Sequence, residues 1–157
     1  MVRASAAGEI KKQVARAVRA GARPLVDGRA FRAAGLGAAY VAPQILEVRD
    51  NGNPIMQDEC FGPVVGVMRV RSDDEAIRLM NDNAFGLTAA IWTVDEDAAI
   101  RIGDKVATGT WFMNRCDYLD PALAWAGVKD SGRGCSLSRV GYEQLTRPKS
   151  FHLRTAL

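Results

Sequence analysis

Apolar residues near the start of the chain recur at helical spacing. The stripe over residues 9–21 consists of Ile10, Val14, Ala17 and Val18, with basic side chains on the opposite side. This spacing predicts an amphipathic helix, and Gly21 is a typical residue at which such a helix ends. Residues 22–39 are rich in Gly, Ala and Arg and predict a short strand at 24–26 followed by an irregular excursion.

Further along, the pattern alternates between strands and helices. Residues 40–48 favour an extended segment, and apolar runs over 64–70, 86–93 and 108–114 predict three more strands. Helical spacing lies between the last three strands, after sequences typical of capping boxes that begin at Ser72 and Thr93. The order predicts an α/β fold with a β-α-β-α-β parallel sheet core and right-handed crossovers.

The last third of the chain has a different character. Residues 115–134 form a loop-like stretch, followed by a helix predicted at 137–146, which Pro148 stops, and a final strand at 150–154. Long ordered loops in compact domains usually carry function. We therefore interpret residues 1–157 as a single domain, with an α/β core at 58–114, a functional loop at 115–134, and a C-terminal helix and strand at 135–157.

Charge and hydropathy exclude two classes of partner. The net charge is +3, from 21 basic and 18 acidic residues that are interleaved along the chain, so no nucleic-acid footprint is expected. No apolar run has the length of a membrane span, and residues 1–20 lack a signal-peptide core. We therefore expect a soluble, cytoplasmic protein with neither a nucleic-acid nor a membrane partner.

The cysteines and the single histidine give little support to metal or triad chemistry. Cys60, Cys116 and Cys135 have neither CxxC spacing nor histidine companions, which fits a reducing compartment without disulfides or a zinc site. A Ser-His or Cys-His pair would have to use His152. The default interpretation of His152 is a residue on a strand surface.

The segment at 58–67 is the most informative short stretch of the sequence. It reads Asp-Glu-Cys-Phe-Gly-Pro-Val-Val-Gly-Val, which places a carboxylate and an aromatic side chain before a Gly-Pro turn and an apolar run. A turn that feeds a strand would explain it structurally. The alternative is that Glu59 faces a cleft at the mouth of a buried strand, as a binding residue would.

Four segments in order carry a family resemblance. They are Glu59 to Val64, Asn81 to Leu87, Gly109 to Asn114 and Gly127 to Gly132. The chain resembles the C-terminal portion of the catalytic domain in the aldehyde dehydrogenase superfamily, from about residue 7 onward. Members oxidise a small aldehyde to a carboxylic acid with NAD or NADP, through a thiohemiacetal and a thioester on a cysteine.

The resemblance implies a partial cofactor site. Glu59 matches a glutamate that accepts hydrogen bonds from the hydroxyls of the nicotinamide ribose, and Phe61 matches an aromatic residue that packs beside that ribose. Chemistry agrees, because one carboxylate can accept from two vicinal hydroxyls and an apolar wall restricts the nicotinamide ring. The structural alternative is an exposed turn glutamate beside a core phenylalanine.

The resemblance also makes residues 115–134 the loop at the mouth of the aldehyde tunnel. Asp117, Tyr118 and Trp125 are its candidate lining residues. Trp125 stands where the family commonly has an aromatic residue facing the tunnel, although a packed core tryptophan is the alternative. Ala126 stands where a glycine is usual, so the local loop shape is expected to differ slightly.

Catalytic residues of the family are absent from this sequence. It contains neither the Gly-Gln-x-Cys motif of the nucleophile nor the Glu-Leu-Gly-Gly-Lys segment of the general base. Cys60 occupies a position that is usually apolar and is interpreted as a small buried residue. Cys116 lies in the tunnel loop without an identifiable base, and Cys135 is expected to pack. The chain alone is therefore expected to be inactive, with no catalytic residue and no metal site.

Three functions remain open from the sequence. The leading hypothesis is a segment of an NAD(P)-dependent aldehyde dehydrogenase, and the second is an interaction module whose strand at 150–154 docks on a full-length homologue or forms a homo-oligomer. The third is a different small α/β enzyme that uses Cys116 or Asp117. An incompletely covered sheet is expected to favour self-association.

Overall fold

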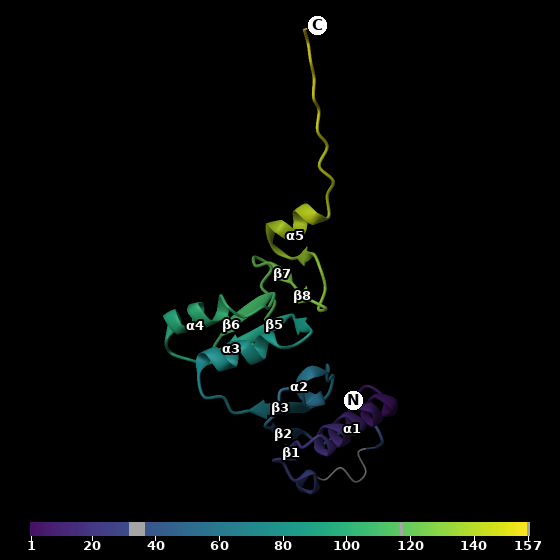
Figure 1. Ribbon diagram of the computed structural model, residues 1–157. Coiled ribbons are helices and arrows are strands. Elements are labelled where there is room, and N and C mark those ends of the chain that lie inside the picture. Colours follow the sequence, from purple (N-terminus) through teal and green to yellow (C-terminus); the bar gives the residue numbers. More distant parts are fainter. Residues whose placement is uncertain (32–36, 117, 157) are drawn as a thin grey trace. The chain divides into compact units, whose positions relative to one another are not determined.

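The computed structural model describes residues 1–31, 37–116 and 118–156, which form two compact units, Met1–Leu79 and Met80–Leu157 (Figure 1). The elements of the first are α1 (Ala4–Arg19), β1 (Arg23–Pro24), the 3-10 helix η1 (Gly28–Ala30), β2 (Gln44–Val48), α2 (Pro54–Gln57) and β3 (Val64–Met68). Helix α3 (Asp73–Asn81) contains the boundary between the units. The second unit continues with β4 (Phe85–Gly86), β5 (Thr88–Ile91), α4 (Glu96–Gly103), β6 (Thr110–Met113), β7 (Trp125–Ala126), β8 (Val128–Lys129), β9 (Cys135–Ser136) and α5 (Ser138–Gln144).

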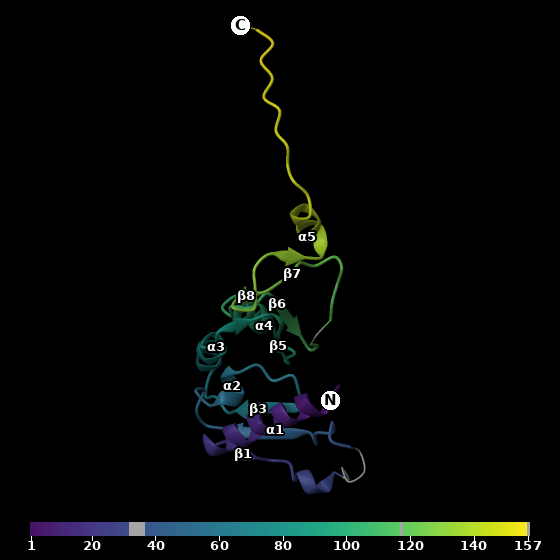
Figure 2. The same cartoon turned by 90° about the vertical axis from the view of Figure 1, so that its right-hand side faces the viewer.

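The first unit is a three-stranded sheet covered on one face by helices. Its order is β1-β2-β3, with β1 antiparallel and β3 parallel to β2. The fully buried side chain of Leu46 is at the centre of a core that also holds Ala17, Ala22 and Val48. Helix α1 runs alongside this sheet (Figure 2), and Ile55 and Met56 of α2 pack against the same core.

Helix α1 ends near Gly21, as the sequence predicts, but it begins at Ala4 rather than at residue 9. Gly21 has φ +97°, and its N–H donates to the Val18 carbonyl while the Ala22 N–H donates to Ala17. These two bonds are a Schellman motif, which a glycine at this position makes possible because the left-handed conformation costs it little. Apolar Ala7 is buried and extends the helical stripe toward the N-terminus.

Asn53 joins the two helices of this unit. Its side chain is 3% exposed, and its Nδ2 donates to the carbonyls of Ala17 at 3.1 Å and Ala20 at 3.2 Å. Its Oδ1 accepts from the Ile55 N–H at 3.2 Å and so caps α2. One amide therefore satisfies carbonyls at the end of α1 and an N–H at the start of α2.

The opposite face of the sheet is open and apolar. Strands expose alternate residues, and here the residues opposite the core are Ile45, Val65 and Val67, which are 38%, 52% and 43% exposed. Ile45 lies opposite Val65 in the register. In this unit a contiguous β-branched surface is left in water, as expected for an incompletely covered sheet.

The second unit contains the other parallel pair. Strands β5 and β6 pair in parallel from Thr88 opposite Thr110 to Ile91 opposite Met113, with α4 as the crossover between them. Its buried apolar residues are Ala99, Ile102, Val106 and Phe112. The parallel strands confirm the α/β class.

Three of the four family-like segments interlock in this unit. Lys129 Nζ donates to the carbonyls of Asn81 and Asn83, both at 2.9 Å, and the Gly86 N–H donates to Ser131 Oγ at 2.9 Å. A Cβ at Gly109 would collide with the Ala126 carbonyl oxygen. The segments at 81–87, 109–114 and 127–132 are therefore packed together by their motif residues.

Of the two predicted helix starts, the one at Ser72 is confirmed and the one at Thr93 is displaced by two residues. Ser72 Oγ accepts from the Glu75 N–H at 3.2 Å, and Glu75 Oε2 accepts from the Arg71 N–H at 2.7 Å, which reproduces the reciprocal bonds of a capping box. For α4 the cap is Asp95, whose Oδ1 accepts from Ala98 at 2.8 Å, rather than the predicted Thr93. Asp95 competes well because its side chain ranks above threonine as a cap.

Two sequence predictions about strands were wrong in detail. The three strands at 64–70, 86–93 and 108–114 do not form one ladder: β3 pairs with β2, while β5 pairs with β6. The pattern gave no sign of this, because pairing partners are not encoded in the periodicity of one strand. Residues 150–154 carry no strand in the described chain. A strand needs a partner backbone, and no described residue supplies one for this segment.

We expect Asn53→Ala to lower the free energy of unfolding by about 2 kcal/mol, because it removes the cap of α2 and the two hydrogen bonds that the amide donates to the carbonyls of Ala17 and Ala20. Asn53→Ser keeps a capping oxygen and should cost about half as much. Urea denaturation followed by circular dichroism measures both. Equal stability of the wild type and Asn53→Ala would show that the joint is dispensable.

The open sheet face should drive self-association. Val65→Thr with Val67→Thr keeps the β-branched shape and adds hydroxyls, so the double variant should stay monomeric to higher concentration than the wild type. Sedimentation velocity over a concentration series measures this. Ile100→Thr, at a residue 63% exposed on α4, is the matched control and should leave the association unchanged.

Candidate cofactor and substrate site

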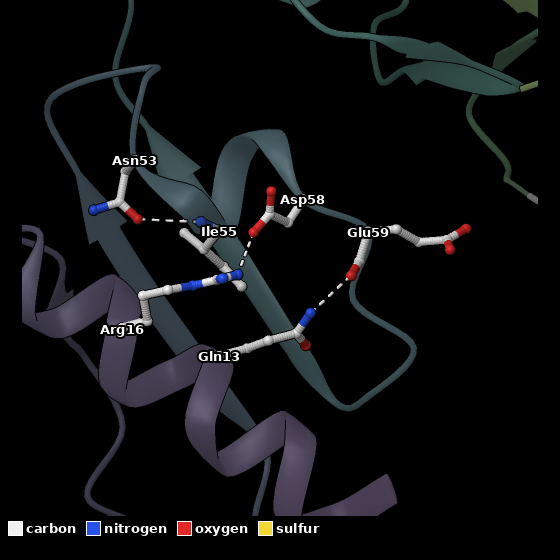
Figure 3. A network of polar contacts seen from close by, with 6 residues as sticks. All are labelled: Gln13, Arg16, Asn53, Ile55, Asp58 and Glu59. Carbon is white, nitrogen blue, oxygen red and sulfur yellow. Dashed lines mark hydrogen bonds and ion pairs between the residues drawn. The ribbon is translucent and has the colours of Figure 1, made fainter. Parts of the chain in front are cut away.

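The loop that joins α2 to β3 presents Glu59 to solvent. Figure 3 shows the Glu59 carboxylate directed away from α1, whereas its main-chain carbonyl faces that helix and accepts from Gln13 Nε2 at 2.9 Å. The neighbouring Asp58 forms an ion pair with Arg16. The main chain at Glu59 is thus held from one side while its carboxylate remains open to a ligand.

Phe61 lies two residues further along the same loop and is 80% exposed. The next residue, Gly62, packs so closely on α1 that a Cβ would come within 2.7 Å of Ile10 Cγ1. The core phenylalanine considered from the sequence is therefore wrong. The loop thus exposes both an aromatic side chain and a carboxylate, at positions two residues apart.

Cys60 lies between these two residues and is half-buried. Burial raises the pKa of its thiol, and a hydrogen bond from the Gly62 backbone opposes that shift. A raised thiol pKa keeps the group protonated at neutral pH, whereas a nucleophile must be a thiolate. This agrees with the interpretation of Cys60 as a small packed residue.

Trp125 lines an open pocket of about 360 Å³ in the second unit. The strand pair β7–β9 places it there, with Trp125 opposite Ser136. The other lining residues are Leu87, Ala126, Gly127, Ser131, Gly132, Arg133, Gly134, Cys135, Ser136 and Gln144. Trp125 is half-buried, so its ring forms part of a wall that a small molecule can reach, as a tunnel residue would.

Tyr118 does not line that pocket. It is 50% exposed, and the Arg115 guanidinium lies 3.9 Å from the centre of its ring, which is a cation–π contact. Asp117, the third candidate for the tunnel, lies outside the described residues. Of the three candidates, the structure places Trp125 alone against a pocket among the parts of the chain that it describes.

Asn114 has a structural role. Its Oδ1 accepts from the Thr93 N–H at 3.0 Å and its Nδ2 donates to the Thr93 carbonyl at 2.7 Å. The side-chain amide thereby extends the β5–β6 ladder by one pair, and the residue itself adopts φ +54°. With both ends of the amide engaged, Asn114 is not free to stabilise an oxyanion.

Neither a cluster of metal-ligating side chains nor a membrane-spanning helix occurs among the described residues. No group of three or more His, Cys, Asp or Glu side chains could hold a metal ion there. Among those same residues, none of the helices combines the length and apolar character needed to cross a bilayer. Cys116 and His152 are both exposed.

Sequence reasoning missed the residues that support the Glu59 loop. Arg16 was counted only among the basic side chains on the polar side of a helix, Gln13 was not singled out, and α2 was not predicted because four residues are too few for a periodic signal. Two signals were present: Asn53-Pro54 is a typical helix start, and Ile10, Gln13 and Arg16 recur every three residues. That spacing puts them on one side of α1.

Comparisons with known proteins agree with the motifs. Residues 1–151 match the model of the aldehyde dehydrogenase family. The fluoroacetaldehyde dehydrogenase of Streptantibioticus cattleyicolor is 42% identical over 133 residues, which cover 83% of this chain and 26% of that enzyme. The NADP/NAD-dependent aldehyde dehydrogenase PuuC of Escherichia coli is 36% identical over 126 residues, or 80% of this chain and 25% of that enzyme.

A solved structure matches over the whole chain. The crystal structure of a Mycobacterium tuberculosis aldehyde dehydrogenase complexed with NAD+ superposes with a TM-score of 0.91 at 29% identity, covering 100% of this chain and 32% of that one. The chain thus spans about a quarter to a third of the length of the proteins it matches. With a family match over nearly its whole length, the chain belongs to the aldehyde dehydrogenase family.

Proposed function

We propose that this chain supplies the nicotinamide-ribose contact and part of the aldehyde-tunnel wall of an NAD(P)-dependent aldehyde dehydrogenase, and that it does not catalyse the oxidation by itself. The exposed pair of Glu59 and Phe61 carries the proposal. The names of two relatives support the cofactor class, since one is NADP/NAD-dependent and the other was solved with NAD+.

Glu59 suits the ribose because its two carboxylate oxygens can accept from vicinal hydroxyls at once. Phe61 offers an apolar surface on which the nicotinamide side of the ligand can rest. When bound, the cofactor accepts a hydride from the substrate. This chain's part is to bind and orient, because the acceptor and the wall lie within three residues of each other on one anchored loop.

Trp125 supports the assignment of the pocket to substrate. Its half-buried ring gives one aromatic surface to an open pocket whose other lining residues are mostly glycines and polar side chains, and that pocket is large enough for a small aldehyde. Tyr118 and Asp117 remain candidates for the rim of the tunnel on the basis of the family resemblance. We draw no preference for a particular aldehyde, because Trp125 is a single wall residue.

Catalysis by the chain alone is not supported. The cysteines do not stand in the nucleophile motif, and the Cys60 thiol has a raised pKa. Cys116 is exposed, and its immediate sequence neighbour Arg115 is engaged with Tyr118. We expect no reduced cofactor when the chain is incubated with NAD+ or NADP+ and a panel of aldehydes. Turnover that disappears in Cys116→Ser would favour the independent small enzyme instead.

The ribose contact is testable with nicotinamide mononucleotide, which carries the nicotinamide ribose without the adenosine half. We expect it to perturb the backbone NMR signals of residues 59–61 with a dissociation constant of about 1 mM or weaker, since only part of the site is present. Glu59→Gln should abolish the effect, because an amide replaces one acceptor oxygen by a donor. Asp97→Asn, which makes the same change of charge on α4, is the control and should bind as the wild type does.

A second candidate function is an interaction module. The segment after α5 alternates exposed Phe151 and Leu153, 72% and 80% exposed, with His152 and Arg154. Alternation of this kind is typical of a strand with one apolar face, and an extended segment can complete another chain's sheet. We propose a second copy or a full-length homologue as its partner.

For this candidate, Phe151→Asp with Leu153→Asp should abolish pull-down of a tagged full-length homologue, because two charges would enter an apolar strand face. His152→Ser with Arg154→Ser, on the alternate positions, should retain binding. Pull-down that survives the Asp substitutions would exclude this segment as the docking strand.

A further inference from the structure

One side of α1 contacts the Glu59 loop at three successive points. Ile10 packs on Gly62, Gln13 donates to the Glu59 carbonyl at 2.9 Å, and Arg16 pairs with Asp58. We name the helix residues Ile10, Gln13 and Arg16 the α1 row. Because the contacts run in opposite order along the two segments, the row meets the loop along its length rather than at one spot. Figure 3 shows the contacts of Gln13 and Arg16.

These contacts restrict the main-chain position of Glu59, from which its side chain extends. The residue before it is held by an ion pair, its own carbonyl is held by a hydrogen bond, and the residue three positions later is packed against the helix. The carboxylate is left outside these contacts (Figure 3). A ligand that binds it therefore meets a loop whose main chain is already ordered, which reduces the entropy lost on binding.

The two polar members of the α1 row, Gln13 and Arg16, are poorly explained by a contribution to folding stability alone. Both side chains of the Arg16–Asp58 pair are about half exposed, at 51% and 47%, and such pairs contribute little to folding. Gln13 lowers the stability of the fold, because its Oε1 is buried without a hydrogen-bond partner among the described residues. An apolar side chain of similar length would avoid that cost but would lose the bond to the Glu59 carbonyl.

We propose that Gln13 and Arg16 are positioning residues, which hold Glu59 in place for the ribose of a nicotinamide nucleotide without touching the ligand. This inference rests on the proposed role of Glu59. Two residues of α1 therefore contribute to the affinity of the loop for the nucleotide. Gln13 is 46 positions from its partner Glu59 in the sequence, and Arg16 is 42 positions from its partner Asp58.

The test uses the full chain with Gln13→Met and Arg16→Met, which keep an unbranched side chain of similar length and remove the polar contacts. Lys12→Met and Arg19→Met are the matched controls on the same helix. Lys12 contacts Glu9 of its own helix at 2.8 Å, and Arg19 takes no part in the three loop contacts described above. Three quantities are measured: amide hydrogen exchange at residues 59–61, affinity for nicotinamide mononucleotide, and the urea midpoint.

We expect Gln13→Met and Arg16→Met each to raise exchange at residues 59–61 and to weaken nucleotide binding about three- to tenfold, with an unchanged or higher urea midpoint. The controls should match the wild type in all three measurements. A merely structural row would instead lower the urea midpoint together with the affinity. That outcome, or affinities equal to those of the controls, would overturn the proposal.

A charge exchange gives an independent check. Arg16→Asp places two carboxylates together and should weaken nucleotide binding, while Arg16→Asp combined with Asp58→Arg should restore it. Failure of the double variant to recover would count against the ion pair as a positioning contact. If the wild type itself shows no response to the nucleotide at Glu59, the ribose assignment fails and this inference fails with it. If the wild type responds and all variants respond equally, only the positioning role is refuted.

Discussion

The buried amide of Asn53 is the contact on which the first unit depends. It donates to carbonyls at the end of α1 and caps α2 with the same side chain. Because α2 runs directly into the loop at 58–63, holding its first turn against α1 also restricts where that loop begins. The joint at Asn53 and the contacts of the α1 row, including that of Gln13, therefore hold the same loop against the same helix. A buried polar group of this kind specifies one arrangement, since no shifted packing would satisfy its donors and its acceptor together.

The four family-like segments divide into two physical kinds. In the three segments of the second unit, polar side chains make hydrogen bonds within the fold. Lys129 donates to main-chain carbonyls, Ser131 accepts from the Gly86 N–H, and Asn114 accepts from the Thr93 N–H and so extends a strand pair. The segment in the first unit differs, because Glu59 and Phe61 have side chains that the surrounding fold leaves exposed. Motif residues that pack explain the shared fold, whereas motif residues left exposed point to a ligand.

Sequence reasoning succeeded where a signal was local. The helices around residues 9–21, 72–83 and 137–146 were found because apolar spacing and end residues such as Ser72 and Gly21 act within a few positions. The pairing between strands could not be predicted in this way, because β3 and β5 are both short apolar runs in the sequence but pair with different neighbours. For the candidate site, Glu59 and Trp125 followed from motifs, but the support from Gln13 and Arg16 joins positions more than forty residues apart.

The close approach of Gly109 to Ala126 has a consequence for how this chain can change. A Cβ at Gly109 would occupy the space of the Ala126 carbonyl oxygen, which is backbone and cannot rotate aside. The methyl group of Ala126 itself stands where the family usually has a glycine and is accommodated beside the pocket. Of these two touching positions, Gly109 is closed to every side chain, whereas Ala126 already carries a methyl group. A change in the shape of this part of the pocket wall must therefore come from the Ala126 side of the contact, because the Gly109 side allows none.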